Sequence, residues 1–411
     1  MMKLLFAIAV PIFLLMSAGA TAQTKLSTGW YRASILRPDA AQIIFNVEVV
    51  DKKGKVLLYI RNGTERLLVD DVKQKGDSLF IDMPFFESSF KLKIQKDQSL
   101  VGKWIKGTSN KNLELPVQFQ YGVKERFPVQ STEKENINGR WQVTFTRPNG
   151  TERPAIAEFQ QKGSYLTGTF LTPAGDYRFL EGVVSADSLY LSCFDGSHAY
   201  LITAKINGNE ITNGSFYNSA SNKEQWRAVK NDKAALPDTT QVTQLKPGES
   251  KLNFTFMDVQ GKKVSINDAR FKNKVVVIQL MGSWCPNCMD ESKFIGEFYK
   301  QYKSKGVEVI ALAYEYSTDF NRSKASVQKF INRFNIKYPV LITPTTVSDE
   351  QRTEKTLPQL TPIRSFPTTL FLDKQGNVKK IHQGFYGPGT GIHYEEFKTE
   401  FYRTIQSLLA D

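Results

Sequence analysis

The stretch Lys274-Val275-Val276-Val277-Ile278-Gln279-Leu280-Met281-Gly282-Ser283-Trp284-Cys285-Pro286-Asn287-Cys288 decides the fold of the C-terminal part of the chain. Its first half is a nearly continuous apolar run, which is typical of a parallel β-strand covered on both faces. After the second cysteine, apolar side chains recur on one helical face, at Phe294, Ile295, Phe298, Tyr299 and Tyr302. The pattern predicts a buried strand followed directly by an amphipathic helix, with two cysteines at the junction.

The position of the two cysteines predicts thiol chemistry. Pro286 suits the first position of a helix, where its missing N–H would have no partner, and this makes Cys285 the N-cap. Free backbone N–H groups and the positive end of the helix dipole favour a thiolate there. Such placement lowers a thiol pKa from about 8.5 into roughly the 3.5–7.5 range. Cys288 lies one turn deeper on the same side, within reach for a disulfide, which suits two-step thiol–disulfide exchange.

Other uses of a C-x-x-C pair are less favoured. A zinc site needs further ligands, but no second C-x-x-C or H-x-x-H pair is present, and Cys193 and the three His are scattered. We therefore expect no metal and no cofactor. A purely structural short-loop disulfide remains an alternative. A peroxidase is less favoured because Gly282, and not a threonine, stands three residues before Cys285.

The pattern after the cysteines continues as alternating strands and helices. A second buried strand is expected at residues 307–313, a helix around Val327–Phe334, a hairpin from residues 368–372 and 378–385, and a closing helix through Phe397 and Leu408. The predicted order is β-α-β-α-β-β-α. This order indicates an α/β domain with a mixed sheet, which we place at residues 250–411.

These motifs in this order resemble the thioredoxin superfamily, and most closely the TlpA/ResA-like periplasmic thiol-disulfide oxidoreductases. The resemblance covers about Ser250 to Asp411 and rests on three segments. They are Gly282-Ser283-Trp284-Cys285-Pro286-Asn287-Cys288, then Glu315 after the second strand, then Ser365-Phe366-Pro367-Thr368-Thr369.

The resemblance implies roles for particular residues. Cys285 and Cys288 would be the catalytic dithiol. Glu315 would be a partly buried carboxylate with a raised pKa that takes the proton from Cys288. Pro367 would follow a cis peptide bond and pack against the sulfur atoms. Phe366 would offer backbone groups to a substrate strand, and Trp284 would form an aromatic platform beside the exposed thiol.

The function that follows is a thiol-disulfide oxidoreductase that reduces disulfides of exported client proteins. A membrane thiol-disulfide electron carrier would then have to supply electrons. Two alternatives stay open. The same residues could work as a disulfide oxidase or isomerase, because the Pro-Asn dipeptide does not decide the direction of electron flow. Alternatively, the N-terminal half could bind a ligand or client, with the redox domain as an accessory.

The N-terminal half predicts antiparallel β-sheets. Short alternating runs such as Ile43–Val49 and Val56–Ile60 are separated by turns at Gly, Asn and Asp, with no helical period between them. The half also repeats at an offset near 110 residues: Asp77-Ser78-Leu79-Phe80 matches Asp187-Ser188-Leu189-Tyr190, and Trp30 matches Trp141. We expect two β-units, at 23–125 and 126–230, each of about eight strands and barrel- or sandwich-like. Residues 231–249 would be a linker.

The first 22 residues predict export. Met1-Met2-Lys3 is followed by an apolar run from Leu4 to Met16 and by Ala20-x-Ala22, which resembles a signal-peptidase site. We expect cleavage near Ala22 and a periplasmic protein with no stable membrane insertion, and an uncleaved anchor is the alternative. The formal net charge is +13, but Lys and Arg are interspersed with Asp and Glu, so no nucleic-acid partner is expected. Cys193, on a strand face with Leu189 and Leu191, is expected to be a buried, inert thiol.

Overall fold

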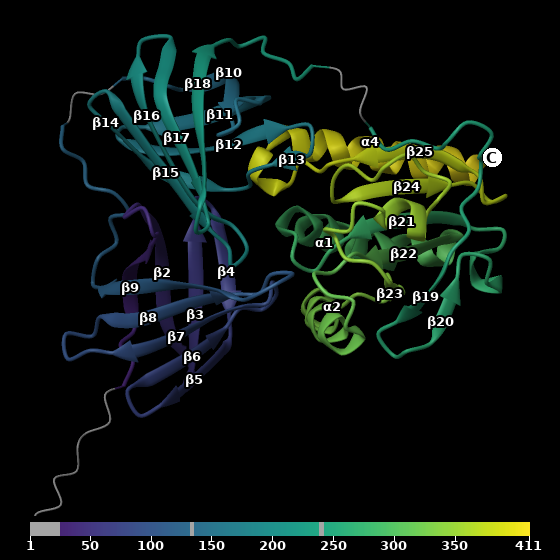
Figure 1. Ribbon diagram of the computed structural model, residues 1–411, viewed down its shortest axis with the longest axis horizontal. Helices are drawn as coiled ribbons and strands as arrows, with labels where there is room; N and C mark the ends of the chain where they lie inside the picture. Colours follow the sequence, from purple (N-terminus) through teal and green to yellow (C-terminus); the bar gives the residue numbers. More distant parts are fainter. Residues whose placement is uncertain (1–24, 132–134, 238–241) are drawn as a thin grey trace, which may run out of the picture.

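A computed structural model describes residues 25–131, 135–237 and 242–411 of the chain. Figure 1 shows two β-units stacked on one side of the molecule and an α/β domain on the other. The predicted signal peptide at residues 1–22 lies outside the described residues. Within the described residues, no helix combines the length and the apolar character that crossing a bilayer requires.

The first β-unit is a nine-stranded antiparallel meander in the order β4-β3-β2-β1-β9-β8-β7-β6-β5. Its strands are β1 (Gly29–Leu36), β2 (Gln42–Lys52), β3 (Lys55–Asn62), β4 (Glu65–Val69), β5 (Asp71–Lys75), β6 (Ser78–Asp82), β7 (Ser88–Ile94), β8 (Leu100–Lys106) and β9 (Leu113–Tyr121). The first strand pairs with the last, and the two edges of the sheet, β4 and β5, are consecutive in the chain. The sheet is therefore barrel-like without hydrogen-bonded closure.

The second β-unit closes into a barrel. Its strands are β10 (Gly139–Thr146), β11 (Glu152–Lys162), β12 (Tyr165–Thr172), β13 (Gly175–Asp176), β14 (Leu180–Ser185), β15 (Ser188–Phe194), β16 (Ala199–Asn207), β17 (Glu210–Asn218) and β18 (Asn222–Lys230). They follow the order β11-β10-β18-β17-β16-β15-β14-β12-β13, and an additional β11–β12 pairing joins the ends. The short strand β13 projects from the barrel toward the α/β domain (Figure 1).

The predicted duplication is confirmed at the level of the fold. Trp30 lies on β1 and Trp141 on β10, while Ser78 begins β6 and Ser188 begins β15, so the matched residues fall on corresponding strands. Both units have nine strands where about eight were expected. The extra strands are short pieces, such as the two residues of β13, which leave no alternation in the sequence.

The two β-units pack tightly against each other. The rings of Phe45 on β2 and Phe194 on β15 stack with their centroids 4.2 Å apart. Nearby, the side-chain amide of Asn62 donates a hydrogen bond to the carbonyl oxygen of Phe194 at 2.8 Å and its oxygen accepts from the amide nitrogen of that residue. The buried guanidinium of Arg126 bridges both units through Asn46 and Ser192. The second barrel is thus fixed on the first.

The α/β domain is built on a seven-stranded mixed sheet in the order β20-β19-β23-β22-β21-β24-β25. Its strands are β19 (Thr255–Asp258), β20 (Lys263–Ser265), β21 (Val275–Met281), β22 (Val307–Ala313), β23 (Val340–Ile342), β24 (Thr368–Leu372) and β25 (Val378–Gln383). The helices are α1 (Pro286–Tyr302), α2 (Phe320–Phe334), α3 (Arg352–Thr356) and α4 (Ile392–Ala410), with short 3₁₀ turns η1 (Ala269–Phe271), η2 (Lys303–Lys305) and η3 (Pro388–Thr390). The pairs β21–β22 and β22–β23 are parallel and the others antiparallel.

The buried central strand explains why α1 begins where it does. Every residue of β21 is buried, as the apolar run predicts. Val275 and Val277 point into the apolar cluster that α1, α2 and α4 cover, and Val276, Ile278 and Leu280 point into the cluster on the opposite face. The chain leaves the sheet after Met281 and enters α1 at Pro286. The end of β21 and the start of α1 are therefore held from both sides of the sheet.

The predicted order of elements was incomplete. The structure adds the β19–β20 hairpin, β23 and α3 to the expected β-α-β-α-β-β-α order. β23 has three residues and α3 has five. Segments this short carry no recognisable period, so hydrophobic patterning does not detect them. The expected fold class, an all-β half followed by an α/β domain with a mixed sheet, is confirmed.

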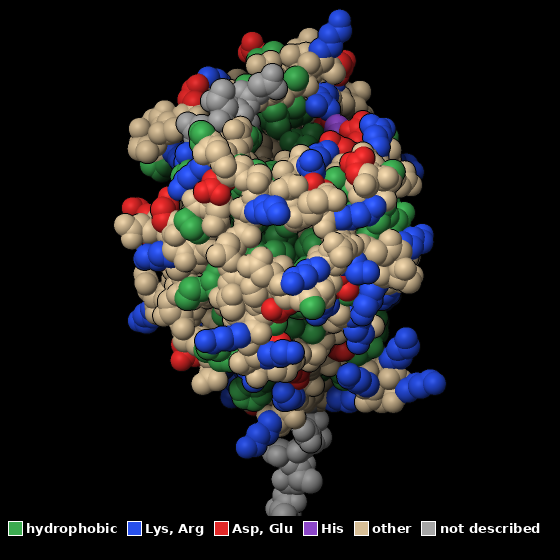
Figure 2. Space-filling model, turned by 90° about the vertical axis from the view of Figure 1, so that its right-hand side faces the viewer, with side chains coloured by type: hydrophobic (Ala, Val, Ile, Leu, Met, Phe, Trp, Pro, Cys, Tyr) green, Lys and Arg blue, Asp and Glu red, His purple; other side chains and the backbone are tan. Residues whose placement is uncertain are grey.

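Basic side chains are spread over the surface. Figure 2 shows Lys and Arg scattered across the face that the α/β domain turns outward, with Asp and Glu between them and no continuous basic stripe. Many of the basic residues pair with a neighbouring acid, for example Lys380 with Glu400 and Arg270 with Glu308. This distribution matches the interspersed charges of the sequence.

Candidate active site

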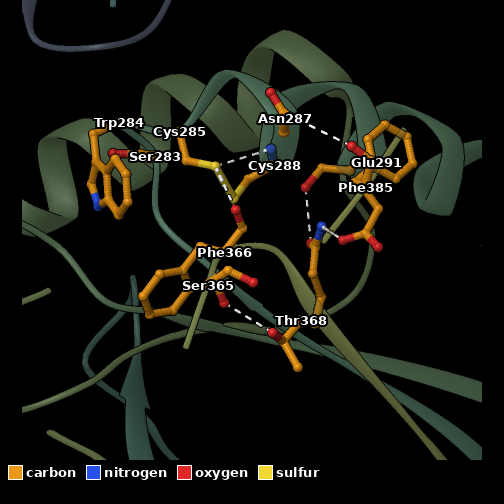
Figure 3. The surroundings of a disulfide bond; sticks show 12 residues. Ser283, Trp284, Cys285, Asn287, Cys288, Glu291, Ser365, Phe366, Thr368 and Phe385 are labelled. Atoms are coloured by element: carbon orange, nitrogen blue, oxygen red, sulfur yellow. Dashed lines mark hydrogen bonds between the residues drawn. A yellow bond between two sulfur atoms is a disulfide. The ribbon is translucent and has the colours of Figure 1, made fainter. Parts of the chain in front are cut away.

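The two cysteines lie at the start of α1 and are joined by a disulfide in the structure (Figure 3). Cys285 is the N-cap, and its Sγ accepts a hydrogen bond from the backbone N–H of Cys288 at 3.2 Å. Pro286 occupies the first helical turn. The predicted local geometry is therefore confirmed. A sulfur in this position faces the positive end of the helix dipole, which stabilises the thiolate when the disulfide is open.

A loop from the other side of the sheet approaches the same sulfur atom. The peptide bond between Phe366 and Pro367 is cis, as the resemblance implies. The carbonyl oxygen of Phe366 lies 3.7 Å from Sγ of Cys285. Pro367 is buried just before β24, and Thr368 anchors the loop by donating a hydrogen bond to the carbonyl of Ser365. Figure 3 shows this loop directly below the disulfide.

Trp284 is half-buried beside Cys285. Its indole N–H donates to the carbonyl of Tyr314 at 2.8 Å, which fixes the ring. The ring stacks on Tyr316 and meets Phe366 edge-on, with centroids 5.5 Å and 5.9 Å away. Trp284 and Phe366 therefore form one aromatic surface next to the disulfide.

Glu315 lies just beyond β22 and contacts the residue two positions before Cys285. One carboxylate oxygen accepts from the backbone N–H of Ser283 at 2.8 Å, and the other from its hydroxyl at 2.6 Å. Burial raises the pKa of Glu315 to about 7, although the two bonds from Ser283 act against the shift. The elevated pKa expected for this residue is confirmed, and its contacts tie it to the loop that carries Cys285.

A second buried carboxylate, Glu291, was not singled out from the sequence. It lies three residues after Cys288 on α1, on the same side of the helix, and it is completely buried. Its oxygens accept hydrogen bonds from Gln279 on β21 and from Thr369 on β24, both at 2.7 Å. Burial raises the pKa of Glu291 to about 7. The spacing Cys288-x-x-Glu291 on a predicted helix was the signal that could have found it.

The second β-barrel also reaches this region, which the sequence did not predict. The amide of Asn287, between the two cysteines, donates to both the backbone oxygen and the carboxylate of Asp176, each at 3.2 Å. On the other side, the hydroxyl of Ser197 donates to the carbonyl of Trp284 at 2.9 Å. The candidate site is therefore lined by both halves of the chain.

The third cysteine lies apart from the site. Cys193 is on β15, is fully buried in the core of the second barrel and has a free thiol. Burial raises the pKa of this thiol, which disfavours the reactive thiolate. The expected buried thiol is confirmed. Across residues 25–131, 135–237 and 242–411, no group of three or more His, Cys, Asp or Glu side chains is placed to hold a metal ion.

Comparison with known proteins identifies relatives of the C-terminal part of the chain. The protein-family model Redoxin matches residues 233–391. Thiol-disulfide oxidoreductase ResA of Bacillus thuringiensis is 31% identical over 158 residues, which span 38% of this chain and 80% of that relative. ResA of Bacillus cereus is 32% identical over 150 residues, which span 36% of this chain and 75% of the relative. Among solved structures, a putative thiol:disulfide interchange protein DsbE from Chlorobium tepidum is 20% identical, with 39% of this chain and 99% of that chain covered and a TM-score of 0.30.

The α/β domain with its C-x-x-C helix start and cis-proline loop is a thioredoxin-superfamily domain. The chain belongs to the ResA-like thiol-disulfide oxidoreductases. The match lies in the C-terminal part, and the two β-units extend N-terminal to it.

Proposed function

We propose that this protein reduces disulfide bonds of exported proteins through a cycle of Cys285 and Cys288. The observation that carries the proposal is the disulfide between these residues, with one sulfur at a helix N-cap and the other one turn deeper. The family supports thiol-disulfide exchange as the chemistry. The order of steps and the direction of electron flow are our proposal.

The cycle conserves electrons and protons. In the dithiol form, the thiolate of Cys285 attacks one sulfur of a client disulfide, forming a mixed disulfide and releasing one client thiolate. The thiolate of Cys288 then attacks Sγ of Cys285, which releases the second client thiolate and leaves the Cys285–Cys288 disulfide. Two electrons pass to the client, whose thiolates take up two protons. A dithiol carrier in the membrane then returns two electrons to the enzyme.

The thiol of Cys288 must lose its proton before it attacks, and a buried carboxylate is the acceptor. Family resemblance assigns this role to Glu315, whereas the helix geometry favours Glu291, three residues after Cys288. A carboxyl group whose pKa is about 7 exchanges protons readily at neutral pH, and both carboxyl groups meet that condition. We assign the proton of Cys288 to Glu291 and give Glu315 the task of holding Ser283 and the loop before Cys285.

The client binds along the cis-proline loop. Phe366 presents its carbonyl beside Sγ of Cys285, so a client strand that pairs with this backbone would bring its disulfide next to the sulfur. The aromatic surface of Trp284 and Phe366 supplies apolar contact for the client. We place the reaction in the periplasm, after removal of residues 1–22. The mature chain would comprise two β-units at 23–125 and 126–230, a linker at 231–249 and the redox domain at 250–411.

Trapping tests the proposed cycle. A full-length Cys288→Ala variant, expressed in its native compartment, should accumulate mixed disulfides through Cys285, because the second attack is blocked. Non-reducing electrophoresis, followed by mass spectrometry of the released partners, measures the trapped clients. The matched control is Cys285→Ala, which keeps one thiol of the pair but should trap none. Equal trapping by both variants would contradict the assigned order of attack.

A further inference from the structure

The disulfide is buried, although its proposed partner is a bulky protein. Cys285 is 4% exposed and Cys288 is fully buried. The N-terminal sulfur of such a pair has to meet another sulfur along a straight line of attack, which requires open space in front of it. Two segments of the second β-unit contact the residues that flank Cys285, namely Trp284 and Asn287.

One covering segment is the stretch Thr172–Arg178, between β12 and β14. Its backbone N–H at Asp176 donates to the carbonyl of Phe385 at 3.3 Å, and the Asp176 carboxylate accepts from the N–H of Gly387 at 3.1 Å. The hydroxyl of Tyr386 donates to the carbonyl of Thr172 at 3.0 Å. The segment is thus docked on the loop that follows β25, next to the cis-proline loop, where the N–H of Gly384 donates to the carbonyl of Pro367.

The same segment contacts the redox motif itself. Asp176 accepts the amide of Asn287 with both its backbone and its side-chain oxygen. The approach at Gly175 is so close that a Cβ there would lie 2.5 Å from the side-chain nitrogen of Asn287. On the other flank, the turn between β15 and β16 holds the carbonyl of Trp284 through Ser197. The segment and the turn therefore bracket Cys285 from both sides.

A buried charge cluster ties the cover to α1. The guanidinium of Arg178 bonds to Glu65 of the first β-unit at 2.7 Å, to Asp195 of the second at 2.9 Å and to Asp290 of α1 at 2.8 Å. Arg178 and Asp195 are almost completely buried. Burial acts to raise the pKa of Asp195, but His198 and Arg178 together hold this pKa below its usual value. One arginine therefore joins the two β-units and the redox helix.

A second contact lies at α2. Glu87 of the first β-unit accepts hydrogen bonds from Arg322 at 2.8 Å and from the hydroxyl of Ser326 at 2.8 Å. Nearby, the rings of Phe85 and Phe334 stack with their centroids 5.8 Å apart. In Figure 1, α1 and α2 both face the β-units. The β-units therefore contact the domain at two places, one on α1 and one on α2.

We propose that the two β-units form a built-in cap over Cys285, which selects clients by size. In the capped arrangement the segment Thr172–Arg178 lies on the loop after β25, next to the cis-proline loop, where it obstructs an approaching client. Cys285 therefore reacts with small reagents much faster than with folded proteins. A folded client reacts only after the cap separates from the loop after β25. This inference rests on the proposed function, because it concerns access to the same sulfur.

Gly389→Ala tests the cap without leaving a buried charge unpaired. A Cβ at Gly389 would lie 2.9 Å from the backbone carbon of Arg178, so the added methyl group wedges the two surfaces apart. In a full-length Cys288→Ala background, we compare the alkylation of Cys285 by two reagents. One is iodoacetamide, and the other is a polyethylene-glycol maleimide of about 5 kDa. Each rate is normalised to that of the urea-unfolded chain and assigned to Cys285 by peptide mapping.

The cap predicts a specific pattern of rates. In the parent, the normalised rate of the large reagent should be at least about tenfold below that of iodoacetamide. Gly389→Ala should raise the large-reagent rate about tenfold, the effect of an overpacked contact. The matched control is Gly296→Ala on α1, where the nearest atom to a Cβ is the carbonyl oxygen of Phe334 at 3.8 Å, and it should change neither rate. If Gly389→Ala does not fold, the Arg322→Ala/Ser326→Ala double variant loosens the cap at α2 and should raise the same rate.

The outcomes separate the cap from the function. Equal normalised rates for both reagents in the parent, unchanged by either cap variant, would overturn the cap while leaving the redox cycle intact. A different result is that Gly389→Ala raises the large-reagent rate as predicted, while the protein with both active-site cysteines exchanges no disulfide with any client. That result would support the cap and refute the proposed function.

Discussion

Cys285→Ser should abolish disulfide reduction, lowering its rate by at least about 10³-fold. Serine matches the size of cysteine, but its hydroxyl is not ionised at neutral pH and does not form a mixed disulfide. Cys288 cannot take over, because it is fully buried beneath Cys285. The assay supplies chemically reduced full-length protein and follows the appearance of client thiols.

The control for this prediction is Cys193→Ala. Cys193 is a free thiol in the core of the second barrel, and the structure places it in a different apolar cluster from the disulfide. Its replacement should leave the reduction rate unchanged. If activity survives in Cys285→Ser but falls in Cys193→Ala, the assignment of the chemistry to Cys285 is wrong. A dithiol form that leaves client disulfides intact, while the disulfide form oxidises client thiols, would favour the oxidase alternative.

Glu291→Gln should slow the second attack, by Cys288, by roughly 10²-fold, the usual loss when a positioned proton acceptor is removed. Glutamine has nearly the same shape and can keep a contact with Gln279 or Thr369, but it does not accept a proton. Because burial raises the pKa of Glu291 to about 7, the ionised carboxylate becomes available as pH rises through 7. The wild-type rate of attack should therefore rise through this range, and the rise should be absent in the variant.

The measurement is the decay of a preformed mixed disulfide on Cys285, followed in single-turnover mode from about pH 5 to about pH 9. This range spans the raised carboxyl pKa of Glu291 and the ordinary pKa of a thiol. Glu315→Gln is the matched comparison, since Glu315 has a similar burial and pKa but accepts its hydrogen bonds from Ser283. We expect a smaller effect there. If Glu315→Gln loses the pH step and Glu291→Gln keeps it, Glu315 is the proton acceptor, as the family resemblance suggests.

The local fold around the cysteines was predictable because it follows from short-range rules. A continuous apolar run, a proline after the first cysteine and a helical stripe of aromatic residues are enough to place Cys285 at an N-cap. The cis bond before Pro367 was a different matter, since no local pattern distinguishes it from a trans bond. It came from resemblance to a family and agrees with the structure.

The cover over the site was not predictable from the sequence. Asp176 and Ser197 are ordinary turn residues of a β-barrel, and their contacts with Asn287 and Trp284 join positions 111 and 87 residues apart. Residues 231–249 are predicted to form a linker, and a linker leaves the relative placement of two domains open. Arg178 shows the same limit, because its partners come from three different parts of the chain.

Alkylation of reduced full-length protein across pH tests the central claim most directly. Iodoacetamide is small enough to report on ionisation, and peptide mapping assigns each rate to Cys285 or Cys288. The structure predicts that Cys285 reacts as a thiolate with a midpoint below about pH 7.5, while Cys288 stays slow until higher pH. Two equally slow thiols, both titrating near the ordinary value of about 8.5, would contradict an N-capping sulfur prepared for attack.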